Sequence, residues 1–148
     1  VRKLCDVRIL IVAASDWLEQ HGTPNDPHAL RDLPCIIDTN FRDPGRWPVC
    51  LQGKATFVPV SGRVRYSNAA ACLSAAEAGL GLACLPGFVA AEALRAGRVR
   101  QVLADFEAEP FGVHALYPHS RHLAAKVRAL VDFLAERYRG TPPWDQGW

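Results

Sequence analysis

Short apolar runs separated by polar turns recur along the chain, and they predict buried strands. Residues 7–14 are almost continuously apolar and rich in β-branched side chains. Such a run indicates a strand that is buried on both faces, as in a parallel sheet. Further strands are expected at residues 35–38, 82–86, 98–105 and 111–118, and on both sides of the turn at residues 52–54.

Helix signals separate these strands. An alanine-rich stretch begins at Asn68, which can cap a helix, and ends at Gly79. A second helix is expected over residues 87–97 and a short one over residues 15–22, while Pro27 marks the start of another. The last helix is expected over residues 122–140, where one face gathers Leu123, Val127, Leu130, Val131, Leu134 and Tyr138 for packing against a core.

This alternation of strands and helices predicts an α/β fold with a largely parallel sheet. A chain of 148 residues has room for one domain or for two small lobes. Hydrophobic residues make up 49% of the chain and charged residues 22%, as in globular proteins. The net charge of +2 gives no reason to expect nucleic acid or a membrane as a direct partner, and we expect a cytoplasmic protein.

The cysteines and histidines do not predict a metal site or a disulfide framework. The five cysteines are an odd number, and none forms a Cys-x-x-Cys pair. His119 and His122 lie three positions apart in a His-x-x-His sequence, without the further ligands that zinc requires. We therefore expect reduced, mostly buried thiols, no metal and no cofactor.

Three glycines in the stretch EAGLGLACLPG, residues 77–87, raise the question of a phosphate-binding loop. A dinucleotide fingerprint needs a strand, then the glycines, then a helix. Here a helix ends before Gly79 and Gly81, and a strand follows them, so we expect a joint between helix and strand. Pro86 and Gly87 follow that strand and lie at its carboxyl end, where open α/β sheets bind ligands.

Several motifs occur in a definite order between about residues 4 and 139. They include ILIVAASDWLEQHGTPNDPHALRDLPCI, then RW with VSGRVRYSNAAACLSAAEAGLGLACLPGFVAAEALRAGRVRQVL, then FGVHALYPHSRHLAAKVRALVDFLAER. This ordered set resembles the effector-binding domain of LysR-type transcriptional regulators. The chain departs from the family pattern at Asp16, where proline is usual, and at Trp17, where tyrosine is usual.

The resemblance implies a periplasmic-binding-protein type II-like fold, with two α/β lobes around a small-molecule cleft. Lobe one would comprise residues 1–22 and 110–139, lobe two residues 23–109, and residues 140–148 a C-terminal tail. The family's DNA-binding helix-turn-helix and the first half of lobe one have no counterpart in the sequence. We therefore expect an incomplete first lobe, exposed apolar faces at Val7–Ala14 and Val113–Leu116, and self-association of the chain.

The resemblance also implies where an effector binds. Unpaired backbone N–H groups at helix N-termini suit a carboxylate. The expected ligand-binding residues are Ser15, Thr39, Ser67, Asn68, Pro86, Gly87 and Phe88. Capping alone and capping combined with ligand contact stay open for Ser15, Ser67 and Asn68. A core position competes with ligand contact for Phe88, and a surface position is favoured for Arg42.

Two other classes of function compete with effector sensing for a transcriptional regulator. An enzyme would need a nucleophile and a base, for which Cys84, His114 and His119 are the candidates. Cys84 falls inside an apolar strand, which opposes its ionisation, and no Gly-x-Ser-x-Gly motif is present. A stand-alone solute-binding protein of the same fold is the other alternative. We expect a non-enzymatic sensor whose partners are a small-molecule effector, other copies of the chain and, through a domain outside this sequence, DNA.

Overall fold

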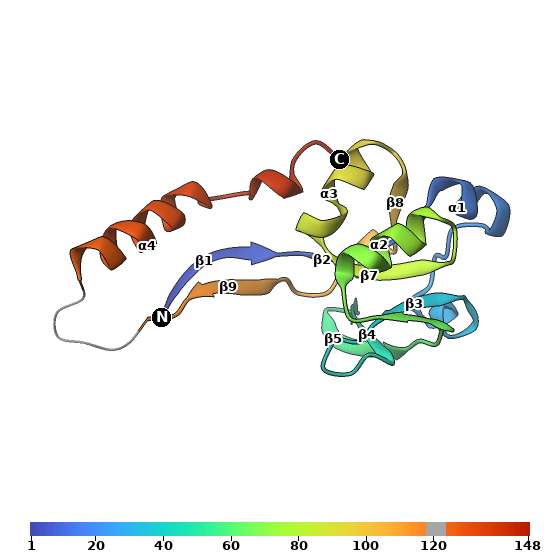
Figure 1. Ribbon diagram of the computed structural model, residues 1–148. Helices are drawn as coiled ribbons and strands as arrows, with labels where there is room; N and C mark the ends of the chain where they lie inside the picture. The colour runs from blue at the N-terminus through green and yellow to red at the C-terminus, as the bar shows by residue number, and fades with distance from the viewer. Residues whose placement is uncertain (118–123) are drawn as a thin grey trace.

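A five-stranded sheet organises most of the chain in the computed structural model, which describes residues 1–117 and 124–148 (Figure 1). In spatial order its strands are β6 (Val64–Tyr66), β3 (Cys35–Asp38), β7 (Leu82–Pro86), β2 (Ile9–Ala14) and β8 (Val99–Val102). Strand β3 runs parallel to β6 and β7, whereas β2 runs antiparallel to β7 and β8. The α/β class is confirmed, but the sheet is mixed rather than largely parallel.

Strand β2 runs against its neighbours because the chain brings it into the sheet at the edge where β7 ends. Ile9 at the start of β2 pairs with Pro86 at the end of β7. All six residues of β2 are buried, as the apolar run predicts. The composition of β2 is typical of parallel sheets, although both of its neighbours are antiparallel to it. Burial on both faces determines that composition, and the direction of the neighbouring strands does not.

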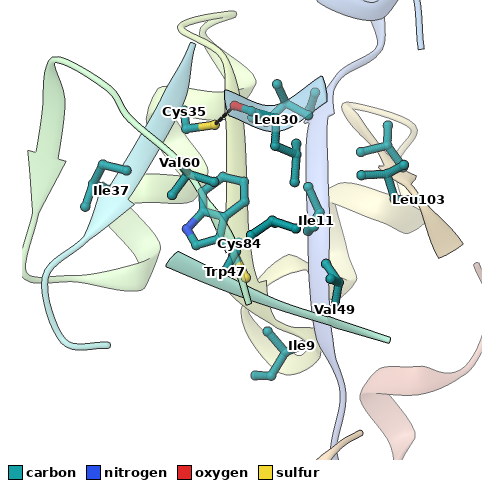
Figure 2. Packing of buried hydrophobic residues seen from close by; sticks show 14 of the residues in the cluster. Ile9, Ile11, Leu30, Cys35, Ile37, Trp47, Val49, Val60, Cys84 and Leu103 are labelled. Atoms are coloured by element: carbon teal, nitrogen blue, oxygen red, sulfur yellow. Dashed lines mark hydrogen bonds between the residues drawn. The ribbon is translucent and has the colours of Figure 1, made fainter. Parts of the chain in front are cut away.

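Different elements cover the two faces of this sheet. Helices α2 (Ala69–Glu77) and α3 (Gly87–Arg95) cover one face, against Leu10 and Val12 of β2. The hairpin of β4 (Arg46–Leu51) and β5 (Lys54–Pro59) and the 3-10 turn η1 (Pro27–Asp32) cover the other face. There the fully buried indole of Trp47 packs among Ile9, Ile11, Val60 and Cys84 (Figure 2).

A second, two-stranded sheet extends away from the first (Figure 1). Strands β1 (Arg2–Val7) and β9 (Phe111–Ala115) pair antiparallel, and we call them the ribbon. Helix α4 (Ala125–Arg137) lies along the ribbon, where Asp132 pairs with Arg2. Helix α1 (Ser15–His21) follows β2, and the short turns η2 (Ala104–Phe106) and η3 (Pro143–Asp145) complete the elements.

The ribbon changes the expected division of the chain into lobes. The single strand expected over residues 7–14 is interrupted at Arg8. Val7 ends β1 of the ribbon, whereas residues 9–14 form β2 of the five-stranded sheet. Residues 9–21 were assigned to lobe one from the sequence. In the structure they form β2 of the five-stranded sheet and α1, which follows it. The hydrogen-bonded pairing of β2 with β7 and β8 is the reason.

The expectation of exposed apolar faces was wrong at one segment and is confirmed at another. Residues 9–14 are buried because β2 lies inside the sheet, and Val7 at the end of β1 is buried in the same core cluster as Ile9 and Ile11. On β9 and just after it, Val113 is 39% exposed and Leu116 77%. On α4, the stripe expected to pack against a core does so in part: Val131 is buried, whereas Leu130 is exposed. Leu123 and the start expected for this helix lie outside the described residues.

The two glycines between α2 and β7 form the predicted joint. Gly79 follows the helix with a φ of +77°, the left-handed conformation expected past a helix C-terminus. Gly81 has a φ of +137°, and a Cβ placed on it would lie 2.1 Å from the carbonyl oxygen of Pro34. No phosphate loop is formed here, because both glycines serve the change of direction.

We predict that Gly81→Ala lowers the free energy of unfolding by about 3 kcal/mol, because the added methyl group overlaps backbone and the φ is unfavourable. Gly79→Ala is the matched control, since its Cβ would meet nothing within 4 Å. That variant should lose only about 1 kcal/mol, from the left-handed φ alone. Urea unfolding measures both values, and equal losses would contradict the close approach to Pro34.

Candidate functional site

Three strands end at one edge of the five-stranded sheet, which we call the carboxyl edge. Because β3, β6 and β7 are mutually parallel, Thr39, Ser67 and Pro86 all lie at this edge. The backbone N–H of Thr39 donates to the carbonyl oxygen of Tyr66 at 2.8 Å, which ties the ends of β3 and β6 together. The structure thus brings together residues that are far apart in the sequence, at the position where such sheets bind ligands.

Ser15 does not belong to this group, contrary to the sequence prediction. It follows β2, which runs the other way, so Ala14 pairs with Val99 while Ile9 pairs with Pro86. The length of β2 separates Ser15 from the carboxyl edge by about 17 Å. The Ser15 hydroxyl donates to the carbonyl oxygen of Gly97 at 2.8 Å, so it ties α1 to the segment before β8.

Asn68 lies at the carboxyl edge and caps α2. Its side-chain oxygen accepts hydrogen bonds from the N–H groups of Ala70 at 2.8 Å and Ala71 at 3.2 Å. Ser67 and Asn68 are both exposed at this edge. The positive end of the α2 dipole therefore opens at the carboxyl edge, where it favours a negatively charged group.

Gly87 and Phe88 begin α3 but turn away from this group. The N–H of Gly87 already donates to the carbonyl oxygen of Arg8 at 2.8 Å. Phe88 is 53% exposed, and its ring meets Trp144 edge to face with the centroids 6.0 Å apart. Phe88 is therefore not a core residue, and it faces the C-terminal tail. Of the α3 residues and its cap, Pro86 is the one that lines a hollow at the carboxyl edge.

That hollow lies between the five-stranded sheet and the start of the ribbon. It has a volume of about 210 Å³ and is lined by Ile9, Asp38, Asn40, Phe41, Pro86 and Phe111. A larger hollow of about 670 Å³ adjoins it and shares Asn40, Phe41 and Phe111, with Arg42, Asp43, Arg46, Pro48 and Phe57 around it. The lining combines aromatic rings with the arginines Arg42 and Arg46 and the carboxylates Asp38 and Asp43, which suits a small ligand that has an apolar body and polar groups.

Several of these lining residues were missed by sequence reasoning. Asn40 and Phe41 directly follow β3, so their position after a buried strand was a signal that could have found them. Arg42 is exposed, as expected, and lines the larger hollow. Arg46 donates to the carbonyl oxygen of Phe57 at 3.3 Å, with its guanidinium 5.9 Å from that ring. Arg46 and Phe111 fall within motifs of the resemblance, but no local pattern indicates that they line a hollow, because only the folded chain brings them to this edge.

The residues considered for an enzyme are not brought together. Cys84 lies on β7 inside the core, where burial raises the pKa of its thiol, while His114 lies on the ribbon. His119 and His122 lie outside the described residues. Burial also raises the pKa of Cys35 to about 12 and of Cys72 to about 11. Within residues 1–117 and 124–148, no three histidine, cysteine or acidic side chains gather as a metal site would require.

No helix within the described part of the chain is long and apolar enough to cross a membrane.

Comparisons with known proteins give a consistent result. A family model described as the LysR substrate binding domain matches residues 1–139. The probable HTH-type transcriptional regulator LtrA of Klebsiella pneumoniae is 34% identical over 138 residues, which cover 91% of this chain and 45% of that protein. The HTH-type transcriptional regulator PtxR of Pseudomonas aeruginosa is 29% identical over 140 residues, which cover 95% of this chain and 45% of that protein.

Solved structures show the same fold. The full-length structure of the Vibrio cholerae virulence activator AphB, a member of the LTTR protein family, gives a TM-score of 0.80 at 28% identity and covers 93% of this chain and 47% of that one. The regulatory domain of CrgA, a LysR-type transcriptional regulator from Neisseria meningitidis, gives 0.75 at 25% identity, covering 93% and 68%. The chain thus spans about half the length of the full-length proteins that it matches.

We predict that the thiols of the core do not react under native conditions. At pH 8, iodoacetamide should modify the half-buried Cys50 first and leave Cys35, Cys72 and Cys84 unmodified, because only the thiolate is nucleophilic. Peptide mass spectrometry locates the modified residues. All five should react in urea, which serves as the control. Fast native modification of Cys84 would restore it as a candidate nucleophile.

Proposed function

Because the chain belongs to the family of LysR substrate-binding domains, we propose that it senses a small effector at the carboxyl edge and does so for a transcriptional regulator. The observation that carries this proposal is the hollow to which the sheet contributes Pro86 and the ribbon contributes Phe111. A molecule bound there contacts both units at once. The named relatives are transcriptional regulators, which supports this function over the stand-alone solute-binding protein.

The lining residues favour an effector with a carboxylate and an apolar or aromatic body. Phe41 and Phe111 offer apolar walls, and in the larger hollow the two arginines, Arg42 and Arg46, outnumber the one carboxylate, Asp43. The exposed side chains of Thr39, Ser67 and Asn68 add hydrogen-bonding groups beside the N-terminus of α2. These groups supply binding and orientation and no reacting group, so we propose a sensor without cofactor or catalysis.

The proposed mechanism is a shift of population between two angles of the ribbon and the five-stranded sheet. An effector that bridges the two favours one angle only to the extent of its difference in affinity for the two states. A helix-turn-helix domain outside this chain would receive the change and act on DNA, as the names of the relatives suggest. We place such a regulator in the cytoplasm, because it works on DNA.

The ribbon also supports the self-association that we propose for the chain. Strands β1 and β9 form a sheet of two, so within residues 1–117 and 124–148 each has one edge without a strand partner. Exposed apolar side chains lie along the same unit, among them Val113, Leu116 and Phe133. A second copy related by a twofold axis offers the same edge in return, which makes it the occupant that we favour.

We predict that Val113→Lys combined with Phe133→Lys shifts the chain towards the monomer, because charges on that face oppose its burial. Sedimentation velocity over a range of concentrations measures the effect. Leu80→Lys is the control, since Leu80 is 49% exposed at a different position, between α2 and β7. A wild-type chain that is monomeric at all concentrations would contradict the proposed association.

We predict that a screen of small carboxylic acids and aromatic compounds finds ligands that raise the Tm. A ligand at about a hundred times its Kd stabilises the fold by about 2.7 kcal/mol, which is about 5–10 °C for a chain of this size. Phe111→Ala and Arg46→Gln should weaken the best ligand about tenfold or more. Arg31→Gln, a matched control in η1 away from the hollow, should not. Equal effects of the three variants would contradict the location of the site.

A further inference from the structure

The chain passes between the ribbon and the five-stranded sheet at a small number of places. Arg8 alone joins β1 to β2, and residues 103–110 join β8 to β9. After α4, the chain returns from the ribbon through Tyr138 to the tail, residues 140–148, which lies beside α3 (Figure 1). Any change of angle between the two units must occur at these crossings.

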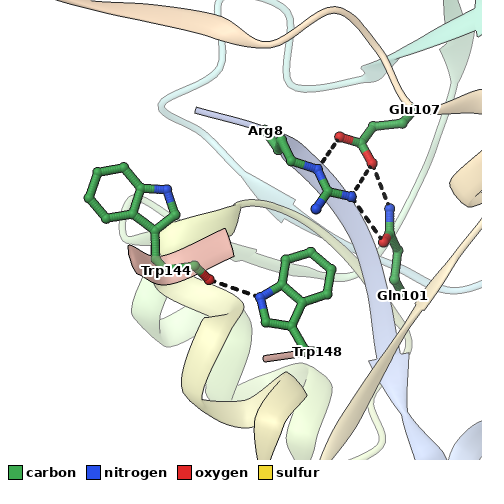
Figure 3. A network of polar contacts seen from close by, with 5 residues as sticks. All are labelled: Arg8, Gln101, Glu107, Trp144 and Trp148. Carbon is green, nitrogen blue, oxygen red and sulfur yellow. Dashed lines mark hydrogen bonds and ion pairs between the residues drawn. The ribbon is translucent and has the colours of Figure 1, made fainter. Parts of the chain in front are cut away.

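Arg8 holds two of the crossings together (Figure 3). Its Nε and Nη2 atoms each donate to a carboxylate oxygen of Glu107 at 2.7 Å. Gln101 of β8 donates to the same carboxylate at 2.9 Å. The carbonyl oxygen of Arg8 accepts from Gly87, at the start of α3. The guanidinium fork and the carboxylate form a two-bond pair, the geometry that restrains orientation most strongly.

The tail reaches the same arginine from the other side. The guanidinium of Arg8 lies 4.6 Å from the centre of the Trp148 ring, and the Trp148 indole donates to the carbonyl oxygen of Trp144 at 2.8 Å (Figure 3). Arg95 of α3 anchors the tail by donating to the carbonyl oxygens of Pro143 at 3.0 Å, Trp144 at 3.3 Å and Gln146 at 2.9 Å. The tail, for which the sequence predicts no packing, is therefore bound to α3 and to Arg8.

The docked tail is held with unfavourable contacts as well as favourable ones. The indole N–H of Trp144 and one carboxylate oxygen of Asp145 are buried without a hydrogen-bond partner among the described residues. A Cβ on Gly87 would lie 2.9 Å from that oxygen, which shows how closely the carboxylate approaches the start of α3. Buried unpaired polar atoms cost free energy, so these two groups oppose the favourable contacts that hold the tail.

We infer that the tail and Arg8 form a lock that fixes the angle between the ribbon and the five-stranded sheet. Arg95 binds the tail to α3, which packs on the five-stranded sheet. The Trp148 ring contacts the guanidinium of Arg8, and Glu107 binds Arg8 to the second crossing, residues 103–110. Release of the tail frees one face of Arg8 and loosens both crossings. The lock itself needs no effector; only its consequence, that tail release changes the response to an effector, rests on the proposed function.

The test measures the angle directly in the 148-residue chain. Nitroxide labels on Glu19→Cys in α1 and His114→Cys in the ribbon, with Cys50→Ser to remove the half-buried thiol, report a distance distribution by pulsed electron resonance. Arg95→Gln and Trp148→Leu should each broaden that distribution or shift its mean. Amide exchange at Arg8 and over residues 103–110 should also become about fivefold faster or more, while β3 and β7 keep their protection.

Two controls separate a lock from a general loss of stability. Arg98→Gln removes an arginine that pairs with Glu77 and Glu92 and makes no contact with the tail, and it should leave the distance distribution unchanged. Trp148→Phe keeps an aromatic ring for Arg8 and should restore the wild-type distribution. Unchanged distances in Arg95→Gln and Trp148→Leu would overturn the inference, as would a rise of exchange that is equal in all strands. Neither result depends on finding an effector, so failure of the lock is distinguishable from failure of the proposed function.

Discussion

The rest of the structure depends on the pairing of β2 with β7. Six consecutive buried residues of β2 enter the middle of the sheet, and Ile9 is aligned with Pro86. This pairing buries Leu10 and Val12 against the helices on one face, and Ile9 and Ile11 against the hairpin on the other. Loss of one such large side chain in a core typically costs about 2–5 kcal/mol, which is a large part of the stability of a small domain.

The same pairing places the functional groups. Because Ile9 meets Pro86 at the carboxyl edge, the residue before it, Arg8, must lie where the sheet ends and the ribbon begins. The hollow at that edge is therefore built from the sheet on one side and from Phe111 of the ribbon on the other. The position of this hollow between the sheet and the ribbon therefore follows from where β2 enters the sheet.

Sequence patterns located the elements that depend on neighbouring residues. The Asn68 cap, the left-handed Gly79 and the burial of β2 are all local properties, and the structure has each of them. The direction of β2 is not local, because an apolar run is compatible with parallel and antiparallel partners. Because β2 is antiparallel to β7, Ser15 lies at the opposite edge of the sheet from Thr39 and Pro86. Sequence patterns likewise did not show that Arg46 and Phe111 line a hollow. Their positions depend on the hairpin and on the crossing before β9.

In the proposed lock, favourable and unfavourable contacts of the tail oppose one another. Arg95 donates three hydrogen bonds to tail carbonyls, and the Trp148 ring covers Arg8. These contacts stabilise the docked tail. Against them stand the Trp144 N–H, which has no hydrogen-bond partner in the described part of the chain, and the Asp145 carboxyl, whose pKa burial raises although Arg8 opposes the shift. A fully satisfied tail would hold one angle so firmly that a small effector, which contributes only a few kcal/mol of differential binding, would not change it. In the proposed lock, imperfect pairing in the tail lowers the difference in affinity that an effector must supply to shift the population.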